Sequence, residues 1–167
     1  MKLALDIHHD GDGAWVAAVA FDDWDAPEPT RTNTSHVAQP PKAVRGALDL
    51  RDLPCFLQLL QAHALQAEVI VINGSVHLDA LEAPGLGRHL YHALGGLTAI
   101  VGVSRTPGPD TPAQFQIIRE EETRPLTITC VGIDIGAAKA RLRAMHGKRR
   151  IPTLLKLVTR LAKGAAA

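Results

Sequence analysis

The sequence has few aromatic residues, few cysteines and no long apolar run, and each shortage excludes a class of protein. Aromatic residues make up 4% of the 167 residues, which argues against a base-stacking platform for nucleic acid. Two cysteines, Cys55 and Cys130, are too few for a disulfide framework or a cysteine zinc cluster. No apolar run approaches the ~18 residues of a membrane span, and a strand-like start with an early Asp6 is unlike a signal peptide. We therefore expect a cytoplasmic protein with no membrane partner.

Acidic residues are absent from the end of the chain. All 17 Asp and Glu residues precede Ile135, whereas nine of the 18 Lys and Arg residues follow Asp134. The part up to Asp134 therefore carries a net charge of −8 and the rest +9, although the whole chain is only +1. Such a separation favours a polyanionic partner.

The length and the order of apolar segments predict one α/β domain. We expect a single domain over residues 1–164 and a short tail at 165–167. Apolar periodicity predicts strands at Lys2–Ile7, Ala14–Phe21, Ala43–Leu50, Glu68–Ile72, Leu97–Val103, Phe115–Arg119 and Leu126–Val131. It predicts helices at Leu53–Gln66, Gly87–Leu94, Ala137–His146 and Pro152–Lys163, and a proline-rich loop at Asp22–Pro41. An antiparallel hairpin and third strand, followed by parallel strands with crossover helices, predict a ribonuclease H-like mixed sheet flanked by helices.

Five segments, taken in order, resemble the endonuclease V family. Leu5–Phe21 (LDIHHDGDGAWVAAVAF) resembles the opening hairpin of that family, and Leu53–Gln61 (LPCFLQLLQ) resembles its segment Y-I-P-G-x-L-x-x-R-E. Val69–Leu90 resembles a buried strand ending in D-G and then G-L-A-x-H-L, and Ile100–Arg105 (IVGVSR) resembles I-G-V-A-K. Leu126–Leu142 resembles the last strand, S-x-G-H and the following helix. The resemblance implies a nuclease fold, a nucleic-acid partner and a role in DNA repair.

Most functional positions of the family are replaced in this sequence. The family's metal and catalytic set is Asp, Glu, Asp and His, and only the first is retained, as Asp6. The other three positions fall on Gln61, Asn73 and Ile133. The family's lysine falls on Arg105, which can still contact phosphate. The tyrosine with which the family opens a duplex falls on Asp52, which cannot stack.

These replacements weaken the proposed metal site. Mg²⁺ binds through charged oxygens, so Asp6 with two amides would hold it poorly, and each lost catalytic group costs decades of rate. We therefore expect an endonuclease V-like protein that binds DNA or RNA, needs no cofactor and has lost most or all phosphodiester cleavage. One alternative is an active divergent Mg²⁺-dependent endonuclease for inosine-containing or structured DNA or RNA, its site rebuilt with Asp10, Asp12 or Asp134. A second alternative is a non-catalytic protein-interaction module, with the acidic segment Asp22–Glu28 around Trp24 as its surface.

The basic end provides the candidate contacts to nucleic acid. Lys139, Arg143 and His146 recur on one helical face, and the last predicted helix is amphipathic with a basic side. One interpretation is two solvated helical faces, and the other is a surface that contacts phosphates. On the second interpretation the nucleic-acid-binding residues are Arg105, Lys139, Arg143, Lys148, Arg149, Arg150, Lys156 and Arg160.

Overall fold

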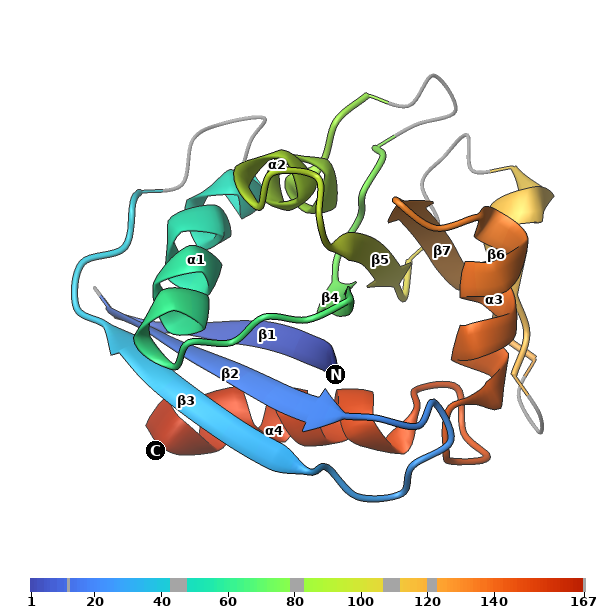
Figure 1. Ribbon diagram of the computed structural model, residues 1–167, viewed down its shortest axis with the longest axis horizontal. Helices are drawn as coiled ribbons and strands as arrows, with labels where there is room; N and C mark the ends of the chain where they lie inside the picture. The colour runs from blue at the N-terminus through green and yellow to red at the C-terminus, as the bar shows by residue number, and fades with distance from the viewer. Residues whose placement is uncertain (12, 43–47, 79–82, 107–111, 120–122, 167) are drawn as a thin grey trace.

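A seven-stranded mixed sheet forms the centre of the computed structural model (Figure 1), which describes residues 1–11, 13–42, 48–78, 83–106, 112–119 and 123–166. The strand order is β3-β2-β1-β4-β5-β7-β6. β2 pairs antiparallel with both β3 and β1. β4 pairs parallel with both β1 and β5, and β7 pairs antiparallel with both β5 and β6. The α/β fold class and the mixed sheet predicted from the sequence are confirmed.

The chain begins with the predicted hairpin. β1 (Lys2–Asp10) and β2 (Gly13–Phe21) pair with Asp6 opposite Ala17, and both strands extend further toward the turn than the apolar pattern indicated. His8 and His9 therefore lie on β1 rather than in the turn.

The third strand lies elsewhere than predicted. β3 (Arg31–Val37) pairs with β2 and comes from the segment interpreted as a loop. The prediction of a strand at Ala43–Leu50 is wrong for its last three residues, because they belong to a short 3₁₀ helix (Leu48–Arg51). Residues 43–47 lie outside the described part of the chain. β3 lies at the edge of the sheet, where an antiparallel strand can leave one of its faces open to water. Its sequence therefore lacks the apolar residues by which a strand is predicted.

The parallel half of the sheet follows from continuous apolar runs. β4 (Val69–Asn73) pairs with β1, and β5 (Ala99–Ser104) pairs with β4, so all three strands end at the same edge. β7 (Leu126–Val131) and the short β6 (Gln116–Ile117), which follows a 3₁₀ turn at Ala113–Phe115, complete the sheet.

Helices cover both faces of the sheet (Figure 1). α1 (Asp52–Ala62) and α2 (Leu86–Ala93) pack on one face against Leu3, Leu5 and the same-facing residues of β2 and β4. α3 (Ile135–Ala144) and α4 (Thr153–Ala166) pack on the other face against Ala4, Ala17 and Val71. α4 continues two residues past the predicted domain end at Gly164. Within the described residues, no helix is both long and apolar enough to cross a membrane.

A buried arginine holds the connection between α3 and α4. Arg119 is 4% exposed, and its guanidinium donates to the carbonyl oxygens of Met145, Gly147 and Arg149 at 2.5, 2.8 and 2.7 Å. Burial lowers the pKa of this guanidinium. Because these three carbonyls follow α3, Arg119 fixes the turn that delivers α4 to the sheet.

Candidate nucleic-acid interface

The site begins with a small cavity at the edge where β1, β4 and β5 meet α4. Its volume is about 20 Å³, close to the size of one water molecule. Apolar side chains form most of its wall, and three polar residues face it: Asn73, Arg105 and Thr159. The fold therefore brings two predicted site residues, Asn73 and Arg105, to one place.

Asp6 lies next to this cavity and is tightly held. Its side chain is on the α4 side of β1 and is 7% exposed. One carboxylate oxygen accepts the backbone N–H of Ile7 at 2.8 Å, and the other accepts the hydroxyl of Thr159 at 2.6 Å. No sequence pattern indicates Thr159, because a threonine on an amphipathic helix has no distinguishing signal.

The residues around Asp6 do not fit a magnesium ion. Asn73 is an exposed amide at the end of β4, Thr159 is a neutral hydroxyl, and Arg105 follows β5 with a positive charge. Mg²⁺ prefers anionic oxygens, and both Asp6 oxygens already accept protein donors. Within the described residues, no group of three His, Cys, Asp or Glu side chains is arranged to hold a metal.

An open groove with basic walls adjoins the cavity. It is lined by the side chains of Arg105, Thr153, Lys156, Thr159 and Arg160, so α4 contributes four residues and the end of β5 contributes one. Lys156 and Arg160 are exposed and lie one helical turn apart. We call these five residues the phosphate groove. The three cations in this groove match the negative charge of a phosphate.

Comparison with known proteins gives matches among solved structures. No family model matches the sequence, and no curated protein matches it either. Among solved structures, endonuclease V from Ciona intestinalis, bound to DNA containing an inosine followed by a ribo-adenosine, matches with a TM-score of 0.77 and 15% identity. The alignment covers 99% of this chain and 85% of that one.

Two further relatives show the same similarity. Endonuclease V from Streptomyces avermitilis matches with a TM-score of 0.76 and 22% identity, over 99% of this chain and 80% of that one. Human endonuclease V matches with a TM-score of 0.74 and 19% identity, over 99% of this chain and 85% of that one. The chain has the endonuclease V fold. At these identities the similarity establishes the fold, and the chemistry has to be argued from the residues.

Two positions matched to endonuclease V from the sequence do not join Asp6. Gln61 is exposed near the end of α1, which packs on the opposite face of the sheet. Ile133 lines a surface groove with Lys2 and Glu68, at the edge where β1 and β4 begin. Asp6 and Asn73 are therefore brought together, and Gln61 and Ile133 are not.

Asp52, the position matched to the family's duplex-opening tyrosine, makes a polar contact within the fold. It begins α1, and its carboxylate lies 2.6 Å from the imidazole Nε2 of His9, with both side chains largely buried. His9 faces α1, on the opposite side of β1 from Asp6, because side chains alternate along a strand. Asp52 thus connects the start of α1 to the end of β1.

Of the three other acids considered for a rebuilt metal site, the two that the structure describes, Asp10 and Asp134, do not join Asp6. Asp134 caps α3, where its carboxylate accepts the backbone N–H groups of Gly136 and Ala137 at 2.9 and 3.3 Å. It follows β7, which runs antiparallel to β5, so it lies at the opposite edge of the sheet. Asp10 is exposed at the end of β1, and residue 12 lies outside the described part of the chain.

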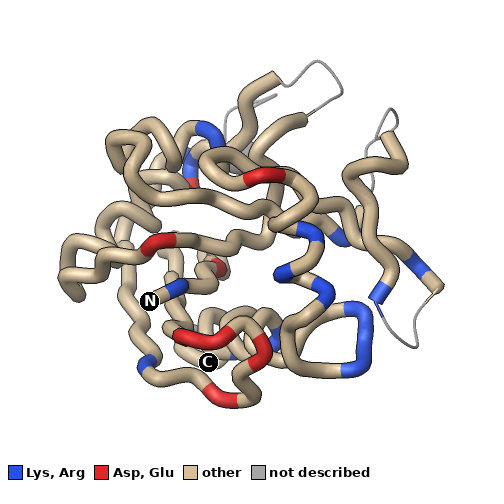
Figure 2. Tube along the Cα trace, turned by 45° about the vertical axis from the view of Figure 1, so that its right-hand side comes forward, with Lys and Arg blue, Asp and Glu red and all other residues tan. Residues whose placement is uncertain are grey.

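The predicted basic residues separate into three groups. Arg105, Lys156 and Arg160 line the phosphate groove. Lys139 and Arg150 make hydrogen bonds within the fold: Lys139 donates to Gln114 O at 2.8 Å, and Arg150 donates to the carbonyls of Arg105 and Pro125. Arg143, Lys148 and Arg149 are exposed on or after α3. Figure 2 shows the blue Lys and Arg positions gathered mainly at the right of the view.

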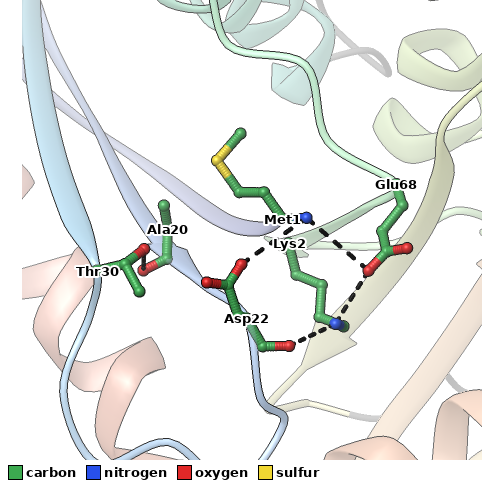
Figure 3. A network of polar contacts seen from close by, with 6 residues as sticks. All are labelled: Met1, Lys2, Ala20, Asp22, Thr30 and Glu68. Atoms are coloured by element: carbon green, nitrogen blue, oxygen red, sulfur yellow. Dashed lines mark hydrogen bonds and ion pairs between the residues drawn. The ribbon is translucent and has the colours of Figure 1, made fainter.

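The acidic segment lies beside the N-terminus (Figure 3). The terminal ammonium lies 3.9 Å from the Asp22 carboxylate and 4.0 Å from that of Glu68, and Lys2 forms a 2.9 Å ion pair with Glu68. This ion pair lowers the pKa of Glu68. Trp24 packs edge-on against Phe21, with ring centroids 5.5 Å apart. Part of the negative charge is therefore neutralised within the chain.

Proposed function

We propose that this protein binds the phosphate backbone of DNA or RNA through the phosphate groove and has lost metal-dependent cleavage. The observation that carries the proposal is the environment of Asp6. Its carboxylate faces Thr159, and the shared cavity is lined by Asn73 and Arg105 instead of further acids. Three positive charges remain beside it, on Arg105, Lys156 and Arg160. The site is thus suited to hold a phosphodiester and is poor in groups that would bind a catalytic metal.

Electrostatics give this proposal a quantitative signature. A cation that neutralises a phosphate releases condensed counterions, so affinity falls as salt rises. Removing one such contact reduces the slope of log affinity against log salt by about 0.9 for duplex DNA and about 0.7 for a single strand. A cation that only supports the fold leaves the slope unchanged.

The test is fluorescence anisotropy of labelled oligonucleotides across a salt series. We expect Lys156→Gln and Arg160→Gln each to weaken binding and to reduce the salt slope by roughly one contact. Arg88→Gln is the matched control, because Arg88 lies on α2, which covers the other face of the sheet. Absence of binding at low salt, or equal losses in all three variants, would contradict the proposal.

The second candidate is an active divergent endonuclease. Two observations favour it: the chain has the fold of endonuclease V, and Asp6, the first acid of the family's metal set, is retained on β1. Cleavage of inosine-containing DNA or RNA in Mg²⁺ or Mn²⁺ that is lost in Asp6→Ala would establish this candidate.

A further inference from the structure

Three rings form a row across the antiparallel part of the sheet. His8 on β1 pairs with Trp15 on β2, and Trp15 pairs with His36 on β3. All three lie on the face that carries Asp6, because residues two apart on a strand share a face. Strand register thus brings these three rings together, although aromatic residues are few in the sequence.

The row is partly open to solvent. His36 is exposed, and His8 and Trp15 are half-buried. The rings of Trp15 and His36 have centroids 4.5 Å apart and planes tilted by 39°. The His36 ring lies against Gly13, where a Cβ atom would come within 2.7 Å of its Nε2. Glycine at this position leaves room for the imidazole beside the indole.

The row lies on the same face of the sheet as the phosphate groove. His8 is two residues beyond Asp6 on the same face of β1, a separation of about 7 Å, and Asp6 is bonded to Thr159 of the groove. Trp15 and His36 lie one and two strands further out, at about 5 Å per strand. By this strand geometry, Trp15 and His36 lie about 9 and 12 Å from Asp6. An exposed cation of α4, Lys163, lies beyond the groove toward the end of the helix.

We propose that Trp15 and His36 form a stacking platform for the bases of a single-stranded nucleic acid whose backbone lies in the phosphate groove. This inference rests on the proposed function and specifies its ligand. A single strand is required because bases in a duplex are stacked on one another and do not present their faces. Stacking on an indole is tolerant of sequence, since every base has a π-face, so binding depends on bases being present and little on which ones.

The test compares three ligands of equal length: an unstructured oligonucleotide, an oligomer of abasic sites and a hairpin duplex. We expect the oligonucleotide to bind about tenfold more tightly than the abasic oligomer, and Trp15→Ala to remove that preference. The salt slope with the abasic oligomer stays unchanged in Trp15→Ala, because its backbone contacts are intact. Trp24→Ala is the matched control, because Trp24 packs against Phe21 near the other end of β2.

A second measurement leaves the platform unaltered. In Trp24→Phe protein, Trp15 is the only tryptophan, and we expect its fluorescence to be quenched by the oligonucleotide and little affected by the abasic oligomer. Equal affinity for both ligands together with no difference in quenching would overturn the platform, while salt-dependent binding would leave the phosphate groove standing. Failure of all ligands to bind at low salt would overturn both.

Discussion

Thr159 donates a 2.6 Å hydrogen bond to the carboxylate of Asp6, and this bond joins the last helix to the first strand across 153 residues of sequence. The carboxylate is 7% exposed and accepts one further bond, from the Ile7 backbone. An acid that a nuclease fold would place beside metal is here satisfied by protein donors. The contact therefore stabilises the packing of α4 and at the same time occupies the oxygen that a metal would need.

Replacing Thr159 by valine tests the first part of this account. Valine has nearly the same shape as threonine, so Thr159→Val removes only the hydroxyl and leaves an oxygen of the buried Asp6 carboxylate without that donor. We expect the free energy of unfolding to fall by about 1–3 kcal/mol, measured by urea denaturation. Thr32→Val is the control, because Thr32 is exposed on β3, and it should change stability by less than about 0.5 kcal/mol. Equal stabilities of the two variants would contradict a structural role for the bond.

Restoring acids around Asp6 tests the second part. The double variant Asn73→Asp/Thr159→Asp places two carboxylates on the cavity beside Asp6. Repulsion between the acids should destabilise the metal-free protein, and Mn²⁺ should raise its melting temperature, because oxygen ligands with negative charge bind this class of cation. The unaltered protein should show no such increase. A similar Mn²⁺ response in both proteins would show that the existing residues already hold the metal.

Apolar patterning predicts the centre of this fold well and its edge poorly. β4 and β5 are continuous apolar runs because helices cover both of their faces, so their sequences contain the signal. β3 (RTNTSHV) alternates between exposed and half-buried positions at the sheet edge, and its polar residues resemble a loop. Its side chains are held by polar contacts, such as the bond of Ser35 to His63 at 3.0 Å, which no hydrophobic pattern reveals.

The candidate site was predictable where residues follow strands. The sequence places Asp6, Asn73 and Arg105 at or just after the ends of predicted strands. The prediction for Asp6 is wrong in one respect, because β1 continues to Asp10 and Asp6 lies within it. Parallel pairing nevertheless brings Asp6 beside the end of β4 at Asn73, and the end of β5 lies next to it. Thr159 is absent from the sequence prediction, because its hydroxyl reaches the Asp6 carboxylate only when α4 packs over β1. Gln61 matches the family's glutamate only by its spacing in a weak motif. In the structure, α1 begins at Asp52 beside the end of β1 and carries Gln61 away to its other end. Long-range packing, which sequence spacing does not contain, decides both cases.

Arg119 should be among the most sensitive positions outside the site. Arg119→Met removes three donors from the carbonyls of the α3–α4 connection, and we expect a loss of about 2–4 kcal/mol in unfolding free energy. Arg124→Met, at an exposed position, is the control and should lie within about 0.5 kcal/mol of the unaltered protein. Thermal and urea denaturation measure both. A small effect at Arg119 would mean that the connection keeps its shape without the guanidinium.

Cys130 should react slowly with alkylating agents. Burial and, to a smaller extent, the nearby Asp134 raise its pKa from 9.0 to about 11, so about one thiol in a thousand is ionised at pH 8. We expect iodoacetamide to modify Cys130 about a hundredfold more slowly than a free cysteine, as measured by peptide mass spectrometry. Since the thiol form is favoured in the fold, its stabilising contribution is complete below pH 9 and is lost as pH rises toward 11.

Asp134→Asn serves as the control for this thiol. Asparagine still caps a helix, so α3 should persist, while removal of the negative charge lowers the pKa of Cys130 and speeds its alkylation. Modification of Cys130 at the rate of an exposed cysteine in the unaltered protein would contradict the burial seen here.

The most direct test of the account measures binding and cleavage in the same sample. A 5′-labelled, inosine-containing single strand is mixed with excess protein in Mg²⁺ or Mn²⁺, its anisotropy is recorded, and the sample is then resolved on a denaturing gel. We predict that anisotropy rises at low salt, falls with added salt, and that the strand stays intact. Cleavage that disappears in Asp6→Ala would contradict the central claim that this site holds phosphodiesters without cutting them.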